Sequence, residues 1–327
     1  MRTTASCIAA LAAFTLTATG AELRLSGPYT HDNLSIYLVH GQDRVQKKYL
    51  TLSEAIEQRK VVIYETSNVN ILQVENLSAE DVYIQSGEIV KGGKQDRVLQ
   101  DDIIVPSSSG KLNVSAFCVE HGRWTGRGNE SARSFAASPN AIASPEMKRA
   151  VKQMGSQGEV WAEVSAAQDR LTKNLGAPVA ATASPSSYQL TLEAPKVKQT
   201  AEGFKKDLAG LAAKYPDALG YVAAVNGKVT GSDVYSTHDL FRRMWPKLLD
   251  SAAVEAMAVA KPGDKISPPP MTDVRAAATG YGARVTDDKQ VNRRTNSVKA
   301  DLPQGLVFET KDADAPAGPV HRTYVTK

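Results

Sequence analysis

The chain contains very little cysteine. Of its 327 residues only Cys7 and Cys118 are cysteines, and Cys7 lies in the apolar run at the start of the sequence. Removal of that run during export would leave a single thiol, so the fold does not depend on disulfide bonds. A lone thiol is either buried and inert or kept for chemistry.

Apolar runs long enough to cross a membrane are also absent. The Ala-rich run at residues 7–18 is too short to span a bilayer. It follows the basic residue Arg2, and small residues up to Ala21 precede the first acid, Glu22. This layout is typical of a secretory signal peptide. We therefore expect cleavage near Ala21 and a soluble protein that is periplasmic or extracellular, with no membrane contact afterwards.

Charge of one sign is not in strong excess. The formal net charge is +4, and removal of residues 1–21 with Arg2 leaves +3. So mild and evenly spread a charge argues against a nucleic-acid partner. A hydrophobic content of 42% and a charged content of 23% are ordinary for a globular protein.

Several motifs with known chemistry are missing. The Gly-rich stretch near Lys91 lacks the Gly-Lys-Ser/Thr ending of a P-loop, and no dinucleotide-binding glycine fingerprint occurs. The five histidines are scattered and form no His-Glu-x-x-His pattern. The sequence therefore predicts no metal site and identifies no cofactor.

The residue patterns that are present predict an α+β protein. Short β-branched runs between residues 34 and 124, separated mostly by Gly, Asn, Asp, Pro or Ser, indicate an antiparallel β-rich lobe, sandwich-like or barrel-like. A helical middle and a C-terminal lobe of mixed helices and strands follow. In that last lobe Asn226-Gly227 predicts a hairpin, and the apolar face of residues 240–252 predicts a core helix.

The expected organisation has five parts. They are a signal peptide at 1–21, a β-rich lobe at 22–144, a helical segment at 145–176, a linker at 177–187 and a mixed lobe at 188–327, with 22–327 packed as one unit. Residues 123–144 are expected to form a long surface loop. Ser144-Pro145-Glu146 then starts a helix, because it offers a cap, a first-turn proline and an early acid. The linker is rich in Ala, Pro and Ser.

The segment from Ser86 to Trp124 holds the densest set of chemically capable side chains. Lys91-Gly92-Gly93-Lys94 can close a hairpin because glycine tolerates positive φ. Basic side chains with these glycines could hold an anion, and Trp124 could stack on a sugar or base. A solvated hairpin tip with structural ion pairs is an equally good interpretation. The basic candidates are Lys91, Lys94, Arg97 and Arg123.

The same segment offers candidates for catalysis. Glu88 and Glu120 could act as general acid and base. Cys118 could be a nucleophile if His121 lowered its pKa, but residues three apart on a flat strand point to opposite faces. A buried, inert thiol is the more common outcome for a cysteine in a strand.

One stretch resembles a known family. It runs Gly87-Glu88, then Lys91-Gly92-Gly93-Lys94-Gln95-Asp96-Arg97, then Phe117-Cys118-Val119-Glu120-x-Gly122-Arg123-Trp124. This pattern is similar to the domain family associated with ADP-ribosylglycohydrolases and a rhodanese/phosphatase superfamily. The resemblance implies no established reaction, only a link to ADP-ribose or nucleotide metabolism. It favours as working residues Gln95, Arg97, Cys118, Glu120, Arg123 and Trp124.

Three functional hypotheses remain open. The first is an exported protein that binds an anionic small molecule or sugar phosphate through Lys91, Gln95, Arg97, Arg123 and Trp124. The second is a hydrolase-like enzyme that uses Glu88 or Glu120, with Cys118 as a candidate nucleophile. The third is a structural or interaction protein in which the motif only locks hairpins together. The sequence names neither the ligand nor the oligomeric state.

Overall fold

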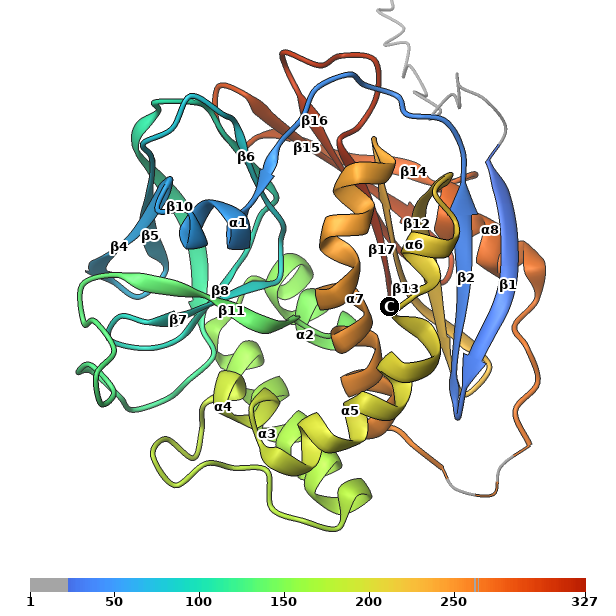
Figure 1. Ribbon diagram of the computed structural model, residues 1–327, viewed down its shortest axis with the longest axis horizontal. Helices are drawn as coiled ribbons and strands as arrows, with labels where there is room; N and C mark the ends of the chain where they lie inside the picture. The colour runs from blue at the N-terminus through green and yellow to red at the C-terminus, as the bar shows by residue number, and fades with distance from the viewer. Residues whose placement is uncertain (1–22, 262, 264) are drawn as a thin grey trace, which may run out of the picture.

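An antiparallel sheet of eight strands forms one side of the molecule (Figure 1). The computed structural model describes residues 23–261, 263 and 265–327, without the side chains of 139–141. Neighbours in the sheet run β1-β2-β12-β13-β17-β16-β15-β14. The strands are β1 (Arg24–His31), β2 (Leu34–His40), β12 (Ala218–Val225), β13 (Lys228–Tyr235), β14 (Arg284–Gln290), β15 (Thr295–Leu302), β16 (Gly305–Asp312) and β17 (His321–Thr326).

This sheet is buried on both faces at its β2–β12–β13 region. Leu34, Ile36 and Leu38 of β2 belong to the main core, whereas Tyr37 and Val39 belong to a second core beneath α8 (Met271–Thr279). The alternation follows from the two-residue period of a strand. Sequence neighbours on β2 therefore stabilise opposite layers.

A second, β-rich lobe is built from residues 50–142. Its six-stranded sheet has the order β11-β7-β8-β10-β5-β4, and β3, β6 and β9 form a three-stranded sheet. The strands are β3 (Leu50–Thr51), β4 (Val61–Asn68), β5 (Ile71–Asn76), β6 (Val82–Ile84), β7 (Glu88–Gly92), β8 (Arg97–Leu99), β9 (Ile103–Val105), β10 (Gly110–Cys118) and β11 (Phe135–Ile142). All pairings are antiparallel except β3 with β6.

Helices fill the space between and below the two lobes (Figure 1). The longest, α7 (His238–Ala258), contacts both β11 of the β-rich lobe and β12 of the large sheet. Its apolar side chains, such as Phe241 and Leu248, lie in the main core. The other helices are α1 (Leu52–Glu57), α2 (Pro145–Arg149), the π-helical turn η1 (Ala150–Met154), α3 (Gln157–Leu175), α4 (Tyr188–Leu192), α5 (Pro195–Leu208) and α6 (Leu211–Lys214).

The α+β class predicted from the sequence is confirmed, and two local expectations are corrected. The loop expected at 123–144 ends in strand β11, which pairs with β7 through an irregular register. One of the β-branched runs expected to form a strand, at residues 98–105, is divided into β8 and β9, with Asp102 between them. Asp102 accepts hydrogen bonds from distant residues, and a sequence pattern does not reveal such partners. The expected signal peptide at 1–21 lies outside the described residues.

A buried polar cluster joins the two lobes. The imidazole of His321 lies between two carboxylates, with Nδ1 2.7 Å from Asp102 and Nε2 3.0 Å from Asp233. Both ring nitrogens face carboxylate oxygens, and these two carboxylates raise the pKa of His321 against the effect of burial, which favours the cationic ring. Lys152 lies 3.8 Å from Asp102, and Lys148 lies 3.2 Å from Asp233. We call this set the interlobe clamp, because Asp102 belongs to the β-rich lobe and His321 to the large sheet.

Across the part of the chain that the structure describes, no helix is both long enough and apolar enough to cross a membrane.

Candidate functional site

The site begins at the hairpin that joins β7 to β8. Gly92 and Gly93 have φ of 117° and 55°, a region that side chains with a Cβ rarely adopt. A Cβ at Gly93 would lie 2.2 Å from the ring of Phe135. The two glycines therefore let the chain turn tightly under β11 and bring Gln95 and Asp96 into the interior. The hairpin predicted for this stretch is present.

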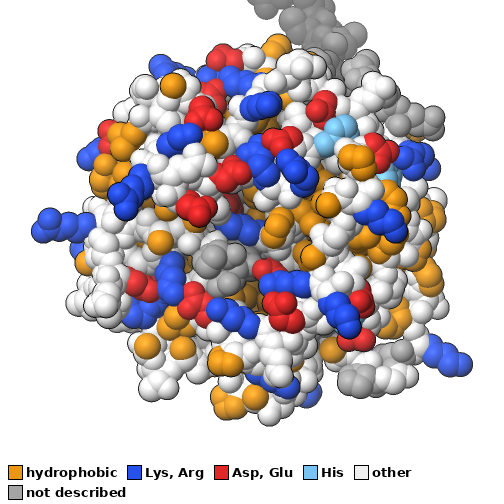
Figure 2. All heavy atoms as spheres, in the orientation of Figure 1, with side chains coloured by type: hydrophobic (Ala, Val, Ile, Leu, Met, Phe, Trp, Pro, Cys, Tyr) orange, Lys and Arg blue, Asp and Glu red, His pale blue; other side chains and the backbone are white. Residues whose placement is uncertain are grey.

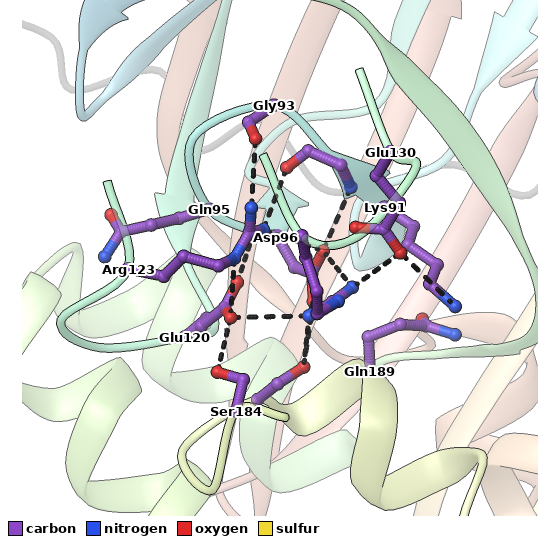
Figure 3. A network of polar contacts seen from close by, with 12 residues as sticks. Lys91, Gly93, Gln95, Asp96, Glu120, Arg123, Glu130, Ser184 and Gln189 are labelled. Carbon is purple, nitrogen blue, oxygen red and sulfur yellow. Dashed lines mark hydrogen bonds and ion pairs between the residues drawn. The ribbon is translucent and has the colours of Figure 1, made fainter. Parts of the chain in front are cut away.

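Two buried carboxylates form the centre of a polar network (Figure 3). Asp96 and Glu120 are both fully buried. The backbone N–H of Asp96 donates to Oε2 of Glu120 at 3.0 Å, and Asp96 accepts from the N–H of Gly92 and the hydroxyl of Ser187. Glu120 also accepts from the hydroxyl of Ser184. The carboxylates thus tie β7, β8, the end of β10 and the segment before α4 together.

Two arginines neutralise these carboxylates. Arg123 donates from Nε to Glu120 at 2.8 Å and from its terminal nitrogens to the carbonyls of Gly92 and Gly93. Arg127 forms a two-pronged bond to Asp96, at 3.0 and 3.1 Å, and lies 3.3 Å from Glu120. Paired N–H donors of this kind fix both distance and orientation. The loop that carries both arginines is therefore held against the hairpin.

A third part of the network reaches the surface. The ammonium of Lys91 donates to both oxygens of Glu193, at 2.7 and 2.9 Å, and lies 3.7 Å from Glu130. Glu130 accepts from Arg127, and Gln189 donates from Nε2 to Glu193. Figure 3 shows Lys91, Glu130 and Gln189 on one side of the network and Gln95 on the other. We call Lys91, Glu130, Gln189 and Glu193 together the Lys91 face.

The electrostatics of the network favour the charged forms. Burial alone would raise the pKa of Glu120, but hydrogen bonds from Arg123, Ser184 and the backbone of Asp96 outweigh it and lower the pKa. Burial would lower the pKa of Arg127, and its bonds to Asp96 outweigh that and raise it. Glu120 is therefore ionised at neutral pH and has no proton to donate as a general acid.

Arg97 and Gln95 are both buried. Arg97 lies 3.5 Å from Glu65 and donates to the carbonyl of Gln95 at 2.6 Å. Nε of Arg97 and both side-chain polar atoms of Gln95 have no hydrogen-bonding partner among the described residues. A buried polar atom without a partner lowers the free energy of unfolding by about 1–3 kcal/mol, so we expect a polar group to lie next to these atoms.

Cys118 is buried and lies outside the network. Its thiol is 3.8 Å from the carbonyl of Val69, and burial raises its pKa. Its backbone N–H and C=O are both held by the side-chain amide of Gln157. The imidazole of His121 packs edge to face against the indole of Trp161, with the ring centroids 4.5 Å apart. No interaction between Cys118 and His121 occurs in the described structure, so the imidazole does not activate this thiol.

The burial of Cys118 leads to a first prediction. In the folded protein at pH 7.5, we expect a maleimide to label Cys118 at least about a hundredfold more slowly than in denaturant, because the thiol is buried and its pKa is raised. Mass spectrometry of the peptide that contains Cys118 separates its labelling from that of Cys7. Labelling at the rate of the unfolded chain would contradict the burial and restore Cys118 as a nucleophile.

The structure separates the two candidate carboxylates. Glu88 is buried, lies 2.9 Å from the ammonium of Lys247, and accepts from the backbone of Gln85. Gln85 in turn donates to Asp233, so Glu88 borders the interlobe clamp. Glu88 and Glu120 share no hydrogen-bonding partner among the described residues. The arrangement does not favour them as an acid and base acting on one substrate.

Trp124 is the exposed aromatic of the predicted set. It follows Arg123 in the fixed loop, and 56% of its surface is accessible. Lys94 also lies outside the centre of the network and donates to the hydroxyl of Ser67 at 2.8 Å. A large exposed aromatic next to a loop held by ion pairs can act as a stacking surface for a sugar or base.

Half of the network was not predicted from the sequence. Arg127 and Glu130 lie in the polar stretch after Trp124, where the density of charge was the available signal. The residues from 184 onward gave no signal, because they lie some sixty or more positions from Glu120 in the sequence. The members not foreseen are Arg127, Glu130, Ser184, Ser187, Gln189 and Glu193.

A metal centre is not formed by these side chains. Within the described residues, no group of three or more His, Cys, Asp or Glu side chains is arranged to hold a metal ion. The carboxylates of the network instead accept from arginine, lysine, serine and backbone donors.

Comparison with known proteins identifies the family. A model of the ARG and Rhodanese-Phosphatase-superfamily-associated Protein domain, ARPP-1, matches residues 22–314. Neither the curated proteins nor the solved structures give a match. The match covers the β-rich lobe, every residue of the network described above, and the large sheet except β17. The chain therefore belongs to the ARPP-1 domain family.

Proposed function

We propose that this protein binds a small polyhydroxylated molecule, a sugar or sugar derivative, at the Lys91 face. The observation that carries the proposal is Gln189. Its side chain is fully buried, yet its carbonyl oxygen has no hydrogen-bonding partner. The atom Oε2 of Glu130 is also buried and also has no hydrogen-bonding partner. Both oxygens belong to the group that surrounds the Lys91 ammonium.

The clustering of such atoms supports a binding role. Eleven buried side-chain atoms of the described residues lack a hydrogen-bonding partner, and two of them, Oε2 of Glu130 and Oε1 of Gln189, belong to the Lys91 face. Native proteins leave few buried polar atoms unpaired, and two such atoms in one group of side chains are typical of a site that receives polar groups from a ligand or ordered water. Partial exposure of Lys91 and Glu130, at 23% and 25%, gives access from solvent.

The charges favour hydroxyl groups over an anion. Arg123, Arg127 and Lys91 all pair with carboxylates, and those three cations face four acids, Asp96, Glu120, Glu130 and Glu193. A bound anion would compete with these carboxylates. Two neighbouring hydroxyl groups can donate to the oxygens of Glu130 and Gln189 and accept from the ammonium of Lys91. An anionic sugar phosphate remains the alternative, with its phosphate at the surface near Lys91.

Two further expectations belong to this proposal. Trp124 supplies a stacking surface next to the fixed loop, as sugar-binding sites often use. The resemblance to a family linked with ADP-ribosylglycohydrolases makes ADP-ribose a reasonable test ligand. We also propose export, on the basis of residues 1–21 alone.

Thermal-shift and calorimetric titration test the proposal. The probes are neutral mono- and disaccharides, the corresponding sugar phosphates, and ADP-ribose. We expect at least one neutral sugar to raise the midpoint of unfolding, because a ligand that binds only the folded state stabilises it. Glu130→Ala should weaken that binding about tenfold or more, which corresponds to loss of one or two hydrogen bonds.

A matched variant separates a site effect from a general loss of charge. Glu57 is an exposed glutamate on α1 with no partner among the described residues, so Glu57→Ala should leave binding unchanged. Binding of sugar phosphates but not neutral sugars would favour the anionic alternative. Binding that Glu130→Ala leaves intact, or no binding by any probe, would contradict the proposed site.

A further inference from the structure

A separate cleft lies where the two lobes meet the start of α7. Its volume is about 610 Å³, within the usual range for sites that bind small molecules, which often lie between structural units. Its lining comes from the segments that lead into β3, β6 and β15 and from the first turns of α7. The walls are formed by Lys47, Lys48, Tyr49, Leu50, Ala79, Glu80, Asp81, Ser107, Asp239, Arg243, Arg294 and Asp314.

The inner wall of the cleft is a fixed mesh of charges. Arg294 lies 3.0 Å from Asp81, 2.8 Å from Asp312 and 3.0 Å from Asp314. Lys47 lies 2.7 Å from Asp81, and Tyr49 donates to Asp312 at 2.7 Å. Because each cation is held by one or more acids, these side chains keep their positions without a ligand. Such preorganisation lowers the cost of binding.

Perturbed ionisation accompanies this geometry. Burial raises the pKa of Tyr49, and the neighbouring Asp312 raises it further. Burial would raise the pKa of Asp81, but bonds from Lys47, the backbone of Ser107 and Arg294 outweigh it and lower the pKa. A concentration of perturbed groups around a cleft is typical of functional sites, although structural ion pairs produce it too.

Charges of both signs reach solvent at the mouth of the cleft. Lys48 is exposed and has no hydrogen bond or ion pair among the described residues. Asp314 is 58% exposed, Asp239 is 43% exposed, and Arg243 pairs with Asp239 at 2.8 Å. Figure 2 shows acidic and basic side chains intermingled over the viewed face of the molecule. The walls hold four basic and four acidic side chains, so a ligand with one sign of charge meets like charges.

We propose that this cleft is a second binding site and that it takes a small zwitterion, an amino acid or short peptide. The ligand's carboxylate lies toward Lys48, which has no ion pair among the described residues. Its ammonium lies toward Asp314, whose side chain is 58% exposed. A zwitterion places each end against the opposite charge, whereas a phosphate or a polyamine does not. The site is independent of the Lys91 face, which shares no residue with it.

Calorimetric titration of the full chain tests the proposal. The probes are the twenty amino acids and the dipeptide Ala-Ala, compared with N-acetylalanine and alanine amide, each of which lacks one of the two charges. We expect a zwitterion to bind, and loss of either charge to weaken binding about tenfold or more. Comparison of the two derivatives shows whether the carboxylate or the ammonium of the ligand contributes more to binding.

Variants at exposed positions keep the fold intact. Lys48→Gln should weaken binding of the zwitterion about tenfold, and Asp314→Asn should weaken it as well. Lys228 is another exposed lysine without a partner among the described residues, so Lys228→Gln should have no effect. Glu130→Ala, on the Lys91 face, should also leave this binding unchanged.

Three outcomes would overturn the proposal. They are no binding by any of these probes at millimolar concentration, equal binding of the singly charged derivatives, and unchanged affinity in Lys48→Gln. Loss of zwitterion binding in Glu130→Ala would show that the ligand occupies the Lys91 face instead. Failure of sugars to bind the Lys91 face does not affect the result for the cleft, because the two sets of variants are separate.

Discussion

Replacing His321 with glutamine is expected to lower the free energy of unfolding by about 3–5 kcal/mol, the usual cost of removing one partner from a buried charge network. The imidazolium bridges Asp102 and Asp233, and all three side chains are buried. Glutamine cannot supply two charged donors, so at least one carboxylate would lose its partner. Urea denaturation at pH 6 measures the difference.

The size of this effect should depend on pH. Burial would lower the pKa of His321, but the carboxylates of Asp102 and Asp233 outweigh it and raise the pKa. A group whose pKa is raised by folding stabilises the protein fully below its unfolded value, about 6.5, and loses that contribution as the pH rises through the folded value. Other ionisable groups that contact the clamp are Lys148, Lys152, Tyr83, Tyr221 and Tyr235.

The acids set the lower limit of the pH window. Burial would raise the pKa of Asp102 and of Asp233, but Lys152, Lys148 and His321 outweigh it and lower both. Their contribution is present above the unfolded value, about 3.9, and is lost as the pH falls through the folded value. The difference between the wild type and His321→Gln should therefore be largest between about pH 4 and 6.5.

A second histidine provides the control for the clamp. His238 also faces an aspartate, Asp43 at 2.7 Å, but both side chains are partly exposed. His238→Gln should change the free energy of unfolding by less than about 1 kcal/mol, because exposed ion pairs contribute little. Equal stability of His321→Gln and the wild type at pH 6 would contradict the clamp, as would a difference that grows above pH 7.

Replacing Glu120 with alanine should destabilise the protein by a similar amount, about 3–5 kcal/mol. Its carboxylate accepts hydrogen bonds from Arg123, Arg127, Ser184 and the backbone of Asp96, and all would lose this partner. Guanidinium denaturation gives the free energy, and limited proteolysis within residues 121–134 reports release of the loop. If Glu120→Ala does not fold, Glu120→Gln gives the same comparison with the shape preserved.

Trp124→Ala provides the contrast within the same loop. Trp124 is exposed, so its removal should change stability by less than about 0.5 kcal/mol. A double-mutant cycle between Glu120 and Arg123 should give a coupling energy above about 1 kcal/mol, because the two side chains are in direct contact at 2.8 Å. Independent effects of the two substitutions would mean that the network does not hold the loop.

Local features of this protein were determined by its sequence. The hairpin at Gly92-Gly93 forms because glycine allows positive φ there, and the turn at Asn226-Gly227 connects β12 to β13 for the same reason. Ser144 caps α2 and Pro145 occupies its first turn, as the three-residue signal predicts. Each of these depends on residues that are neighbours in the chain. The α+β class followed from the same kind of pattern.

Only the tertiary structure decided which distant residues meet. Strand β2 pairs with β12, so the first strands complete the large sheet with strands from the second half of the chain. Asp102 meets His321 across 219 positions, and Asp96 meets Ser187 across 91. Burial and pairing also changed the chemistry expected of the motif: Cys118 lies apart from His121, and Arg123 is neutralised by Glu120. A local pattern specifies backbone conformation, whereas the partner of a buried charge is set by the packing of the whole chain.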